Sequence, residues 1–294
     1  MKFLNYILWV IIFFIFYKIL IIKSNDLESY NNGLALYNES KFQDFNLVFF
    51  YFTDNLFFYF INILSKITRI DGEFILKYLG LFLAIIKLFF FKIKFNKSFN
   101  LISFLYLLNF FYLFDINQLR ESLVITIFLL IILFRTQSNL HIILLSFFHK
   151  SAFILFILNL KISFKNIIYI IFIILIFFNI YLAIDYKWLN SIESLNFFTF
   201  NTLIYFIYFY SIYFQSKPDI STKYLYLILF TFFFFVIFRS YTTILAIRLY
   251  ELGLFFILLS SPQKIKLTSN TIYFYLGFFI FSIYNFIFLY IKYI

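Results

Sequence analysis

The sequence contains no cysteine, only two histidines, five glycines and two prolines among its 294 residues. The absence of cysteine excludes disulfides and thiolate chemistry, and the two histidines, His141 and His149, argue against a structural zinc site. Glycine-rich loops that bind nucleotide phosphates are missing, as are paired-carboxylate metal motifs and the Gly-x-Ser-x-Gly turn of hydrolases. We therefore expect no metal and no other cofactor.

Hydrophobic side chains are abundant: 64% of the residues are hydrophobic and 27% are aromatic. Soluble domains are about 45–50% apolar, so we expect this chain to lie in lipid. Apolar runs long enough to be candidate transmembrane helices follow one another along the sequence. These runs are 3–22, 73–92, 99–115, 122–134, 140–160, 166–184, 198–214, 224–238, 241–260 and 271–291. The sequence predicts an all-α, polytopic integral membrane protein with about ten transmembrane helices, forming a single domain over 1–294. The first run follows a lysine, as in a signal peptide, but no cleavage site of small residues follows it, and we expect it to remain as the first span.

The formal net charge is +11, from 24 Lys and Arg against 13 Asp and Glu. In a soluble protein this excess would favour nucleic-acid binding. In a membrane protein it is better explained by lysines in cytoplasmic loops beside anionic headgroups, so we expect no nucleic-acid partner. The frequent Phe, Ile, Tyr, Asn and Lys are typical of an AT-rich genome and favour a bacterial source.

The positions of the lysines indicate how the chain crosses the membrane, because positive loops favour the cytoplasmic side. The segment 23–46 is the longest polar stretch and carries little net positive charge, which predicts an outer loop. Lys92, Lys94 and Lys97 follow the next long apolar run and are expected inside. The intervening segment 47–65 is therefore predicted to be an amphipathic helix at the outer interface rather than a full span.

A single span over 140–160 conflicts with the charges that follow it. Lys161 and Lys165 favour the cytoplasmic side, whereas the polar segment 185–196 favours the outside. A helix broken near His149 would satisfy both. Broken helices occur in membranes where their backbone lines a cavity within the protein, so we predict a polar cavity there.

Charged residues inside apolar runs are the best evidence for function, because a charge at the bilayer centre costs about 2.5–3.5 kcal/mol. The first group is DINQLRESL, 115–123. On one helix, Asn117, Arg120 and Glu121 would share a face at spacings of three and four. Two interpretations stay open: a hydrated turn whose charges neutralise each other, or a cationic pocket at the outer surface for an anionic ligand.

Two further groups have both a structural and a functional interpretation. In FFHKSAF, Lys150 either snorkels to the interface or serves a site, and His149 either bonds a neighbouring helix or handles a phosphate or hydroxyl proton. In 238–252, Arg248 either pairs with Glu251 or, with Arg239, binds a pyrophosphate through its guanidinium fork.

The stretches NQLRESLVI, 117–125, and FHKSAFI, 148–154, resemble two motifs of the EpsG family of multi-span bacterial proteins. This family is related to the O-antigen and exopolysaccharide polymerases. NDLESY, 25–30, is similar to the Asp-x-x-x-Tyr of the family's first outer loop. TDNLFFYFINILSK, 53–66, is similar to its Glu-Pro-x-aromatic helix, with Asp54 in place of Glu. Arg248 and Tyr250 resemble a late Arg-x-x-Tyr element with a shorter spacing.

The resemblance implies a glycosyltransferase at the outer face of the bacterial cytoplasmic membrane, independent of metal ions and of nucleotide sugars. The implied donor is a glycan on undecaprenyl pyrophosphate, and the implied acceptor is a hydroxyl of a second lipid-linked repeat unit. The expected partners are these lipid-linked glycans, the lipid bilayer, and flippase and chain-length regulator proteins.

The implied catalytic residues are Arg120, on the pyrophosphate, and His149, as the general base for the acceptor or a further phosphate donor. The remaining residues are expected to bind the substrate. They are Arg248 and Arg239 on the pyrophosphate, Lys150 with Ser151 beside the histidine, Asp26, Tyr30 and Asp54 on sugar at the outer vestibule, and Asn117, Glu121 and Tyr250.

Transport is the alternative function. A flippase of lipid-linked sugars, or a transporter of another anionic substrate, would use arginines around a cavity equally well. A flippase needs polar lining through the whole bilayer depth, whereas a polymerase needs it only in the outer half. The predicted topology gathers the polar residues outside, which favours the polymerase. A non-catalytic partner in polysaccharide export is a third possibility.

Overall fold

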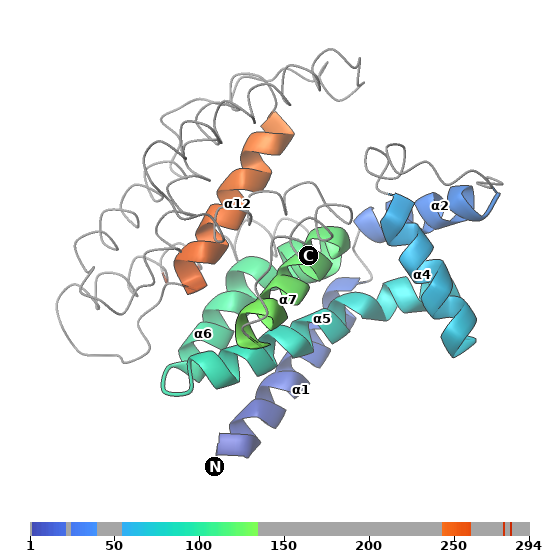
Figure 1. Ribbon diagram of the computed structural model, residues 1–294. Helices are drawn as coiled ribbons and strands as arrows, with labels where there is room; N and C mark the ends of the chain where they lie inside the picture. The colour runs from blue at the N-terminus through green and yellow to red at the C-terminus, as the bar shows by residue number, and fades with distance from the viewer. Residues whose placement is uncertain are drawn as a thin grey trace. The chain divides into compact units, whose positions relative to one another are not determined.

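The computed structural model describes residues 2–21, 25–39, 55–134 and 243–259, together with Phe279 and Ile283. All the regular elements of this part of the chain are helices (Figure 1), which confirms the all-α class there. The chain divides into two compact units. One comprises Met1–Phe153, Gln263–Leu267 and Phe278–Ile294, and the other comprises Ile154–Pro262 and Thr268–Gly277. A single membrane domain stays a prediction.

Seven helical elements of the first unit are described. They are α1 (Lys2–Leu20), α2 (Asn25–Glu39), α4 (Asn55–Thr68), α5 (Gly72–Lys94), α6 (Phe99–Tyr106), the π-helix η2 (Leu107–Asn117) and α7 (Leu119–Phe134). The second unit contributes α12 (Thr243–Leu259).

Two helices are long and apolar enough to cross a membrane. They are α5 over Gly72–Lys94 and the continuous α6–η2 helix over Phe99–Asn117, where the sequence predicts spans at 73–92 and 99–115. With 23 residues, α5 is about 35 Å long, compared with about 30 Å for a hydrocarbon core. Helices also occupy the predicted spans 3–22, 122–134 and 241–260. The spans predicted at 140–160, 166–184, 198–214, 224–238 and 271–291 lie outside the described residues, apart from Phe279 and Ile283, so the number of spans stays a prediction.

The polar segment predicted as an outer loop contains a helix, α2, of 15 residues. The segment 47–65 is described from Asn55 onward, where the 14-residue helix α4 begins. At about 21 Å this helix is too short to cross a bilayer. It is amphipathic, as predicted: Phe57 and Ile61 on one face are fully buried, whereas Lys66 on the opposite face is exposed. Its location at the membrane interface stays a prediction.

One core cluster joins α2, α4, α5 and α7. Its buried members are Tyr30, Leu34, Phe57, Ile61, Leu76, Leu79, Leu83, Leu119 and Leu123. The helix α5 also packs against α1, α6 and η2, and Figure 1 shows it running through the middle of this group of helices. Because every other helix of the group contacts α5, its side chains decide where the others lie.

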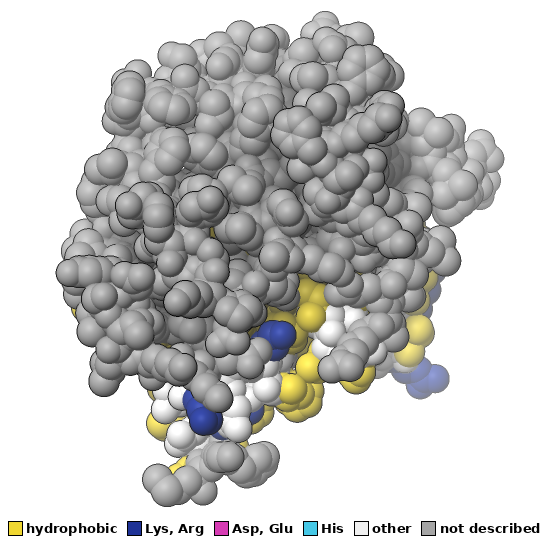
Figure 2. Space-filling model, turned by 60° about the vertical axis from the view of Figure 1, so that its left-hand side comes forward, with side chains coloured by type: hydrophobic (Ala, Val, Ile, Leu, Met, Phe, Trp, Pro, Cys, Tyr) yellow, Lys and Arg dark blue, Asp and Glu magenta, His cyan; other side chains and the backbone are white. Residues whose placement is uncertain are grey.

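Large apolar side chains are exposed on the outer faces of the described helices. On α1, Leu4 is 68% exposed and Ile19 is 52% exposed; on α5, Phe82 is 61% exposed. Figure 2 shows such hydrophobic side chains together with Lys and Arg side chains on the visible face of the described part. Soluble monomers rarely expose large apolar patches, so this surface is compatible with a membrane protein.

A close approach between α5 and η2 requires glycine at position 80. A Cβ atom there would overlap the backbone carbonyl oxygen of Asp115 and would lie 2.8 Å from its carbonyl carbon. The Leu119 side chain would be 3.1 Å away. Since the obstacle is backbone, it cannot turn aside as a side chain could. Gly80 therefore permits the contact that brings Asp115 against α5.

Replacing Gly80 by alanine is expected to lower the free energy of unfolding by about 3 kcal/mol, because α5 and η2 must separate. The measurement is unfolding of the purified protein in detergent. Gly33→Ala is the matched control, since its added methyl group would meet only the far end of the Phe58 ring, which can rotate. We expect that control to change stability by less than about 1 kcal/mol. Equal losses in the two variants would contradict the role given to Gly80.

Candidate functional site

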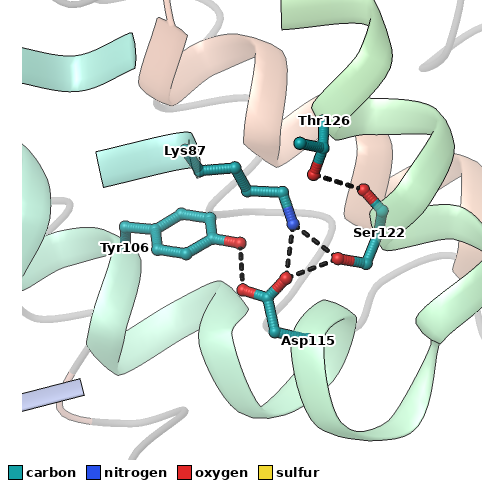
Figure 3. Close-up of polar contacts among 5 residues, drawn as sticks. All are labelled: Lys87, Tyr106, Asp115, Ser122 and Thr126. Carbon is teal, nitrogen blue, oxygen red and sulfur yellow. Dashed lines mark hydrogen bonds and ion pairs between the residues drawn. The ribbon is translucent and has the colours of Figure 1, made fainter. Parts of the chain in front are cut away.

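Lys87 is a fully buried cation inside the apolar helix α5. Its Nζ atom lies 2.5 Å from Oδ1 of Asp115, forming an ion pair, and 2.6 Å from Oγ of Ser122, to which it donates a hydrogen bond. Asp115 belongs to η2 and Ser122 to α7. One ammonium group thus connects three helical elements (Figure 3).

The Asp115 carboxylate is bonded on both oxygens. The Tyr106 hydroxyl, from the last residue of α6, donates to Oδ2 at 2.6 Å, and the Ser122 hydroxyl donates to Oδ1. Thr126, one turn further along α7, donates to the Ser122 carbonyl oxygen at 2.7 Å. Asp115 and Ser122 are completely buried, as is Tyr106. We call Lys87, Tyr106, Asp115 and Ser122 the buried polar network.

The buried polar network satisfies the condition under which charges are tolerated in an apolar interior. An isolated ion there is very unfavourable, whereas a pair is tolerated when further hydrogen bonds occupy its remaining donors and acceptors. Here two hydroxyl groups supply those bonds. Lys87, Asp115 and Ser122 are 0% exposed, so none of them is open to solvent.

The π-helical form of η2 and the break that follows it determine where Asp115 lies. The Gln118 N–H donates to the Leu113 carbonyl at 3.0 Å, a bond across five residues that is typical of π-helices. Gln118 itself leaves helical geometry, with φ −112° and ψ 57°, and α7 begins at the next residue. Such π-turns inside helices are frequent at functional sites.

Two residues predicted for the site, Arg120 and Tyr30, meet beside the buried polar network. The Arg120 guanidinium carbon lies 5.7 Å from the centroid of the Tyr30 ring, within the range of a cation–π interaction. Tyr30 is 8% exposed in the core cluster, and Arg120 is half-buried. The sequence placed these residues in separate motifs, and the fold brings α2 and the start of α7 together.

The prediction that Asn117, Arg120 and Glu121 share one helix face is wrong. Asn117 is the last residue of η2, and the non-helical Gln118 separates it from α7, which carries the other two. The hydrated-turn interpretation also fails, because Asp115 is 0% exposed and Glu121 is 1% exposed. Asn117 is half-buried. Polar side chains do gather at this turn, but they belong to two helices, η2 and α7. Two of them, Asp115 and Glu121, are buried.

The other predicted site residues are described only in part or not at all. Asp26 belongs to α2, and Arg248 and Tyr250 belong to α12, but the structure describes only their helical backbone. Asp54, His149, Lys150 and Arg239 lie outside the described residues, as does the helix break predicted near His149. Their roles stay predictions.

Sequence reasoning missed Lys87. The available signal was a lone lysine in the middle of the apolar run LFLAIIKLFF, inside the predicted span 73–92. A charge at that depth is a candidate for function or pairing. Its partners carried weaker signals, since Tyr106 and Ser122 are common residues in such helices. Only Asp115 stood out, as a neighbour of the Arg120 motif.

No family model, curated protein or solved structure matches the chain. Within the described ranges, no group of three or more His, Cys, Asp or Glu side chains is arranged to hold a metal ion. The case for a function rests on the residues described above and on the motifs of the sequence.

Removing either charge of the buried pair is expected to destabilise the protein strongly. Lys87→Met leaves the Asp115 carboxylate without its cation, and Asp115→Leu leaves the ammonium without its anion; each loss should be about 3–5 kcal/mol in unfolding free energy. The double variant Lys87→Met/Asp115→Leu removes both charges and should lose much less than the sum. Unfolding in detergent measures all three variants.

The matched control is Lys77→Met, the same substitution at an exposed lysine of the same helix. It should change stability by less than about 0.5 kcal/mol. Additive losses in the double variant would mean that Lys87 and Asp115 do not depend on each other.

Proposed function

We propose that this protein is a membrane polysaccharide polymerase of the EpsG and O-antigen polymerase type, spanning the bacterial cytoplasmic membrane several times. The observation that carries the proposal is the contact between Arg120 and Tyr30. These residues belong to NQLRESL and NDLESY, two of the stretches that resemble family motifs. Residues that serve one site should meet in the fold, and these two do.

In the proposed reaction, a glycan grows by transfer between two lipid-linked molecules. The acceptor hydroxyl of one repeat unit attacks the anomeric carbon of the glycan on undecaprenyl pyrophosphate. A glycosidic C–O bond forms, the C–O bond to the pyrophosphate breaks, and the hydroxyl proton passes to a base, for which His149 is the candidate. The leaving pyrophosphate gains negative charge, which fixed cations stabilise.

Arg120 has the properties that pyrophosphate binding requires. A guanidinium keeps its charge when it is desolvated and binds phosphate oxygens through two parallel hydrogen bonds. The Tyr30 ring lies against one side of it, and the residue as a whole is partly exposed. The contact with a buried ring limits the rotamers of a long side chain, so less entropy is lost when the ligand binds.

The setting of this site supports a lipid-linked substrate. The helices α5 and α6–η2 are long and apolar enough to span a bilayer, and Arg120 lies in the first turn of the next helix, α7. A substrate whose lipid tail lies in the membrane and whose pyrophosphate lies at the interface would reach such a position.

Transport stays a second candidate, and the buried Lys87–Asp115 pair is the observation that favours it. Ionisable residues inside membrane helices often mark ion or substrate pathways. The two functions differ in what a deletion strain accumulates. Without a polymerase, single repeat units collect on lipid at the outer face. Without a flippase, they collect at the cytoplasmic face.

Arg120→Ala and His149→Ala are expected to abolish long glycan chains in a deletion strain complemented at matched membrane expression. The loss should be at least about 100-fold in polymer, because each change removes a group that acts on the transition state. The measurement is the length distribution of the glycan on gels. Single lipid-linked repeat units should accumulate instead.

The control is Arg69→Ala, at an exposed arginine in the turn between α4 and α5, which should leave the ladder unchanged. Full-length polymer from Arg120→Ala would exclude Arg120 from the site. Accumulation of repeat units on the cytoplasmic side of the deletion strain would favour the flippase.

Tyr30→Leu is expected to shorten the glycan ladder, whereas Tyr30→Phe should leave it almost unchanged. Leucine lacks the ring face that contacts Arg120, and phenylalanine retains it. A cation–π contact contributes about 1 kcal/mol, so activity should fall roughly fivefold in the leucine variant. Equal activity of the two variants would show that the ring face is not needed to hold Arg120.

A further inference from the structure

We infer that Lys87 is a positioning residue for Arg120: its ammonium holds the end of η2 and the start of α7 in a fixed relation, and so directs the guanidinium. The inference rests on the proposed function, in which Arg120 binds the pyrophosphate of a lipid-linked glycan. It adds a residue that lies in none of the motifs and touches no substrate.

The segment that carries Arg120 contains a single non-helical pivot. Gln118 lies between Asn117, where η2 ends, and Leu119, where α7 begins. Its backbone N–H bonds to Leu113 in η2, and its carbonyl accepts from the Ser122 N–H at 2.8 Å. Rotation about this one residue would change the direction of α7 and of every side chain in its first turn.

Lys87 bridges this pivot. Its Nζ atom contacts Asp115, before Gln118, and Ser122, after it, at 2.5 and 2.6 Å. Arg120 lies within the segment that these two contacts close. The Ser122 hydroxyl also donates to Asp115, so the two sides are joined directly as well as through the ammonium (Figure 3).

A second contact fixes the same segment to the same helix. Gly80 is two turns before Lys87 on α5, and residues seven apart share a helix face. At Gly80 the α5 backbone approaches the carbonyl of Asp115 too closely for a Cβ atom. The helix α5 therefore contacts both the backbone and the side chain of Asp115. Through its bond to Ser122, Lys87 also contacts α7 on the other side of Gln118.

Lys87 can act only through other residues. It is 0% exposed, as are Asp115 and Ser122, and its ammonium already makes an ion pair and a hydrogen bond. Arg120 is the half-buried cation nearest along the chain to the residues it holds. A displacement of about 1 Å at a reacting group can lower a rate about 100-fold, so the loss of this link should be visible in activity.

The test separates positioning from simple stabilisation by using the double variant Lys87→Met/Asp115→Leu, which removes both charges of the ion pair and so leaves neither partner without the other. We expect it to reach the membrane at wild-type amounts and to retain most of the stability, yet to make about 100-fold less polymer in the complemented strain. Lys77→Met, on the same helix, should make polymer as the wild type does. A double variant that recovers both stability and polymer would overturn the inference, because Lys87 would then be structural alone.

A second measurement reports the pivot without depending on activity. The chain has no cysteine, so Gln118→Cys introduces a single thiol at a position that is 5% exposed. Labelling of that thiol by a maleimide should be about tenfold faster when Lys87→Met/Asp115→Leu is also present, because the turn opens more often. Equal labelling rates would overturn the inference.

The two measurements also separate this inference from the proposed function. If Arg120→Ala makes full-length polymer, the polymerase site is wrong. The labelling rates still decide whether the Lys87–Asp115 pair holds the turn: faster labelling supports that part of the inference, and unchanged labelling excludes it.

Discussion

Burying one ammonium group in an apolar interior is the constraint on which the described structure depends. Lys87 is completely enclosed, and an unpaired ion there would destabilise the fold by several kcal/mol. The chain therefore has to bring a carboxylate and hydroxyl groups to one point on α5, from α6, η2 and α7. This requirement fixes the register of three consecutive elements against α5. It also explains why Gly80 must lack a side chain, since the Asp115 backbone has to approach α5 closely.

The candidate site is a consequence of that register. With Ser122 held at Lys87, the first turn of α7 is fixed, and Leu119 and Leu123 enter the core cluster shared with α2 and α4. That packing places Tyr30 against Arg120. The polar interactions and the apolar core thus act on the same turn from two sides. Two motif stretches that are distant in the sequence meet because each packs on α5.

The apolar helices could be predicted from the sequence, whereas the polar helix α2 lies in a segment that was predicted as a loop, and the site could be predicted only in part. Apolar runs locate α1, α5, α6–η2, α7 and α12 within a few residues, because run length and hydrophobicity are local properties. The shared face of Asn117, Arg120 and Glu121 was predicted wrongly. No feature of the local sequence indicates that η2 is a π-helix or that Gln118 leaves helical geometry. Lys87 was overlooked because its importance depends on which residues lie opposite it, and that is decided by tertiary packing. The contact of Arg120 with Tyr30 could likewise not be predicted, although both residues were predicted to belong to the site.

A rigid turn beside a half-buried arginine has a physical advantage for binding a phosphate. An arginine side chain loses about 2 kcal/mol of rotamer entropy when it is fixed, and a mobile backbone turn would add to that loss. Here the Tyr30 ring restricts the side chain, and the hydrogen bonds of Lys87 restrict the backbone that carries it. Both restrictions act during folding, before any ligand arrives, so the ligand's binding energy is not used to order the arginine. Burying Lys87 and Asp115 lowers the free energy gained on folding. In return, the direction of the Arg120 guanidinium is fixed before the ligand binds.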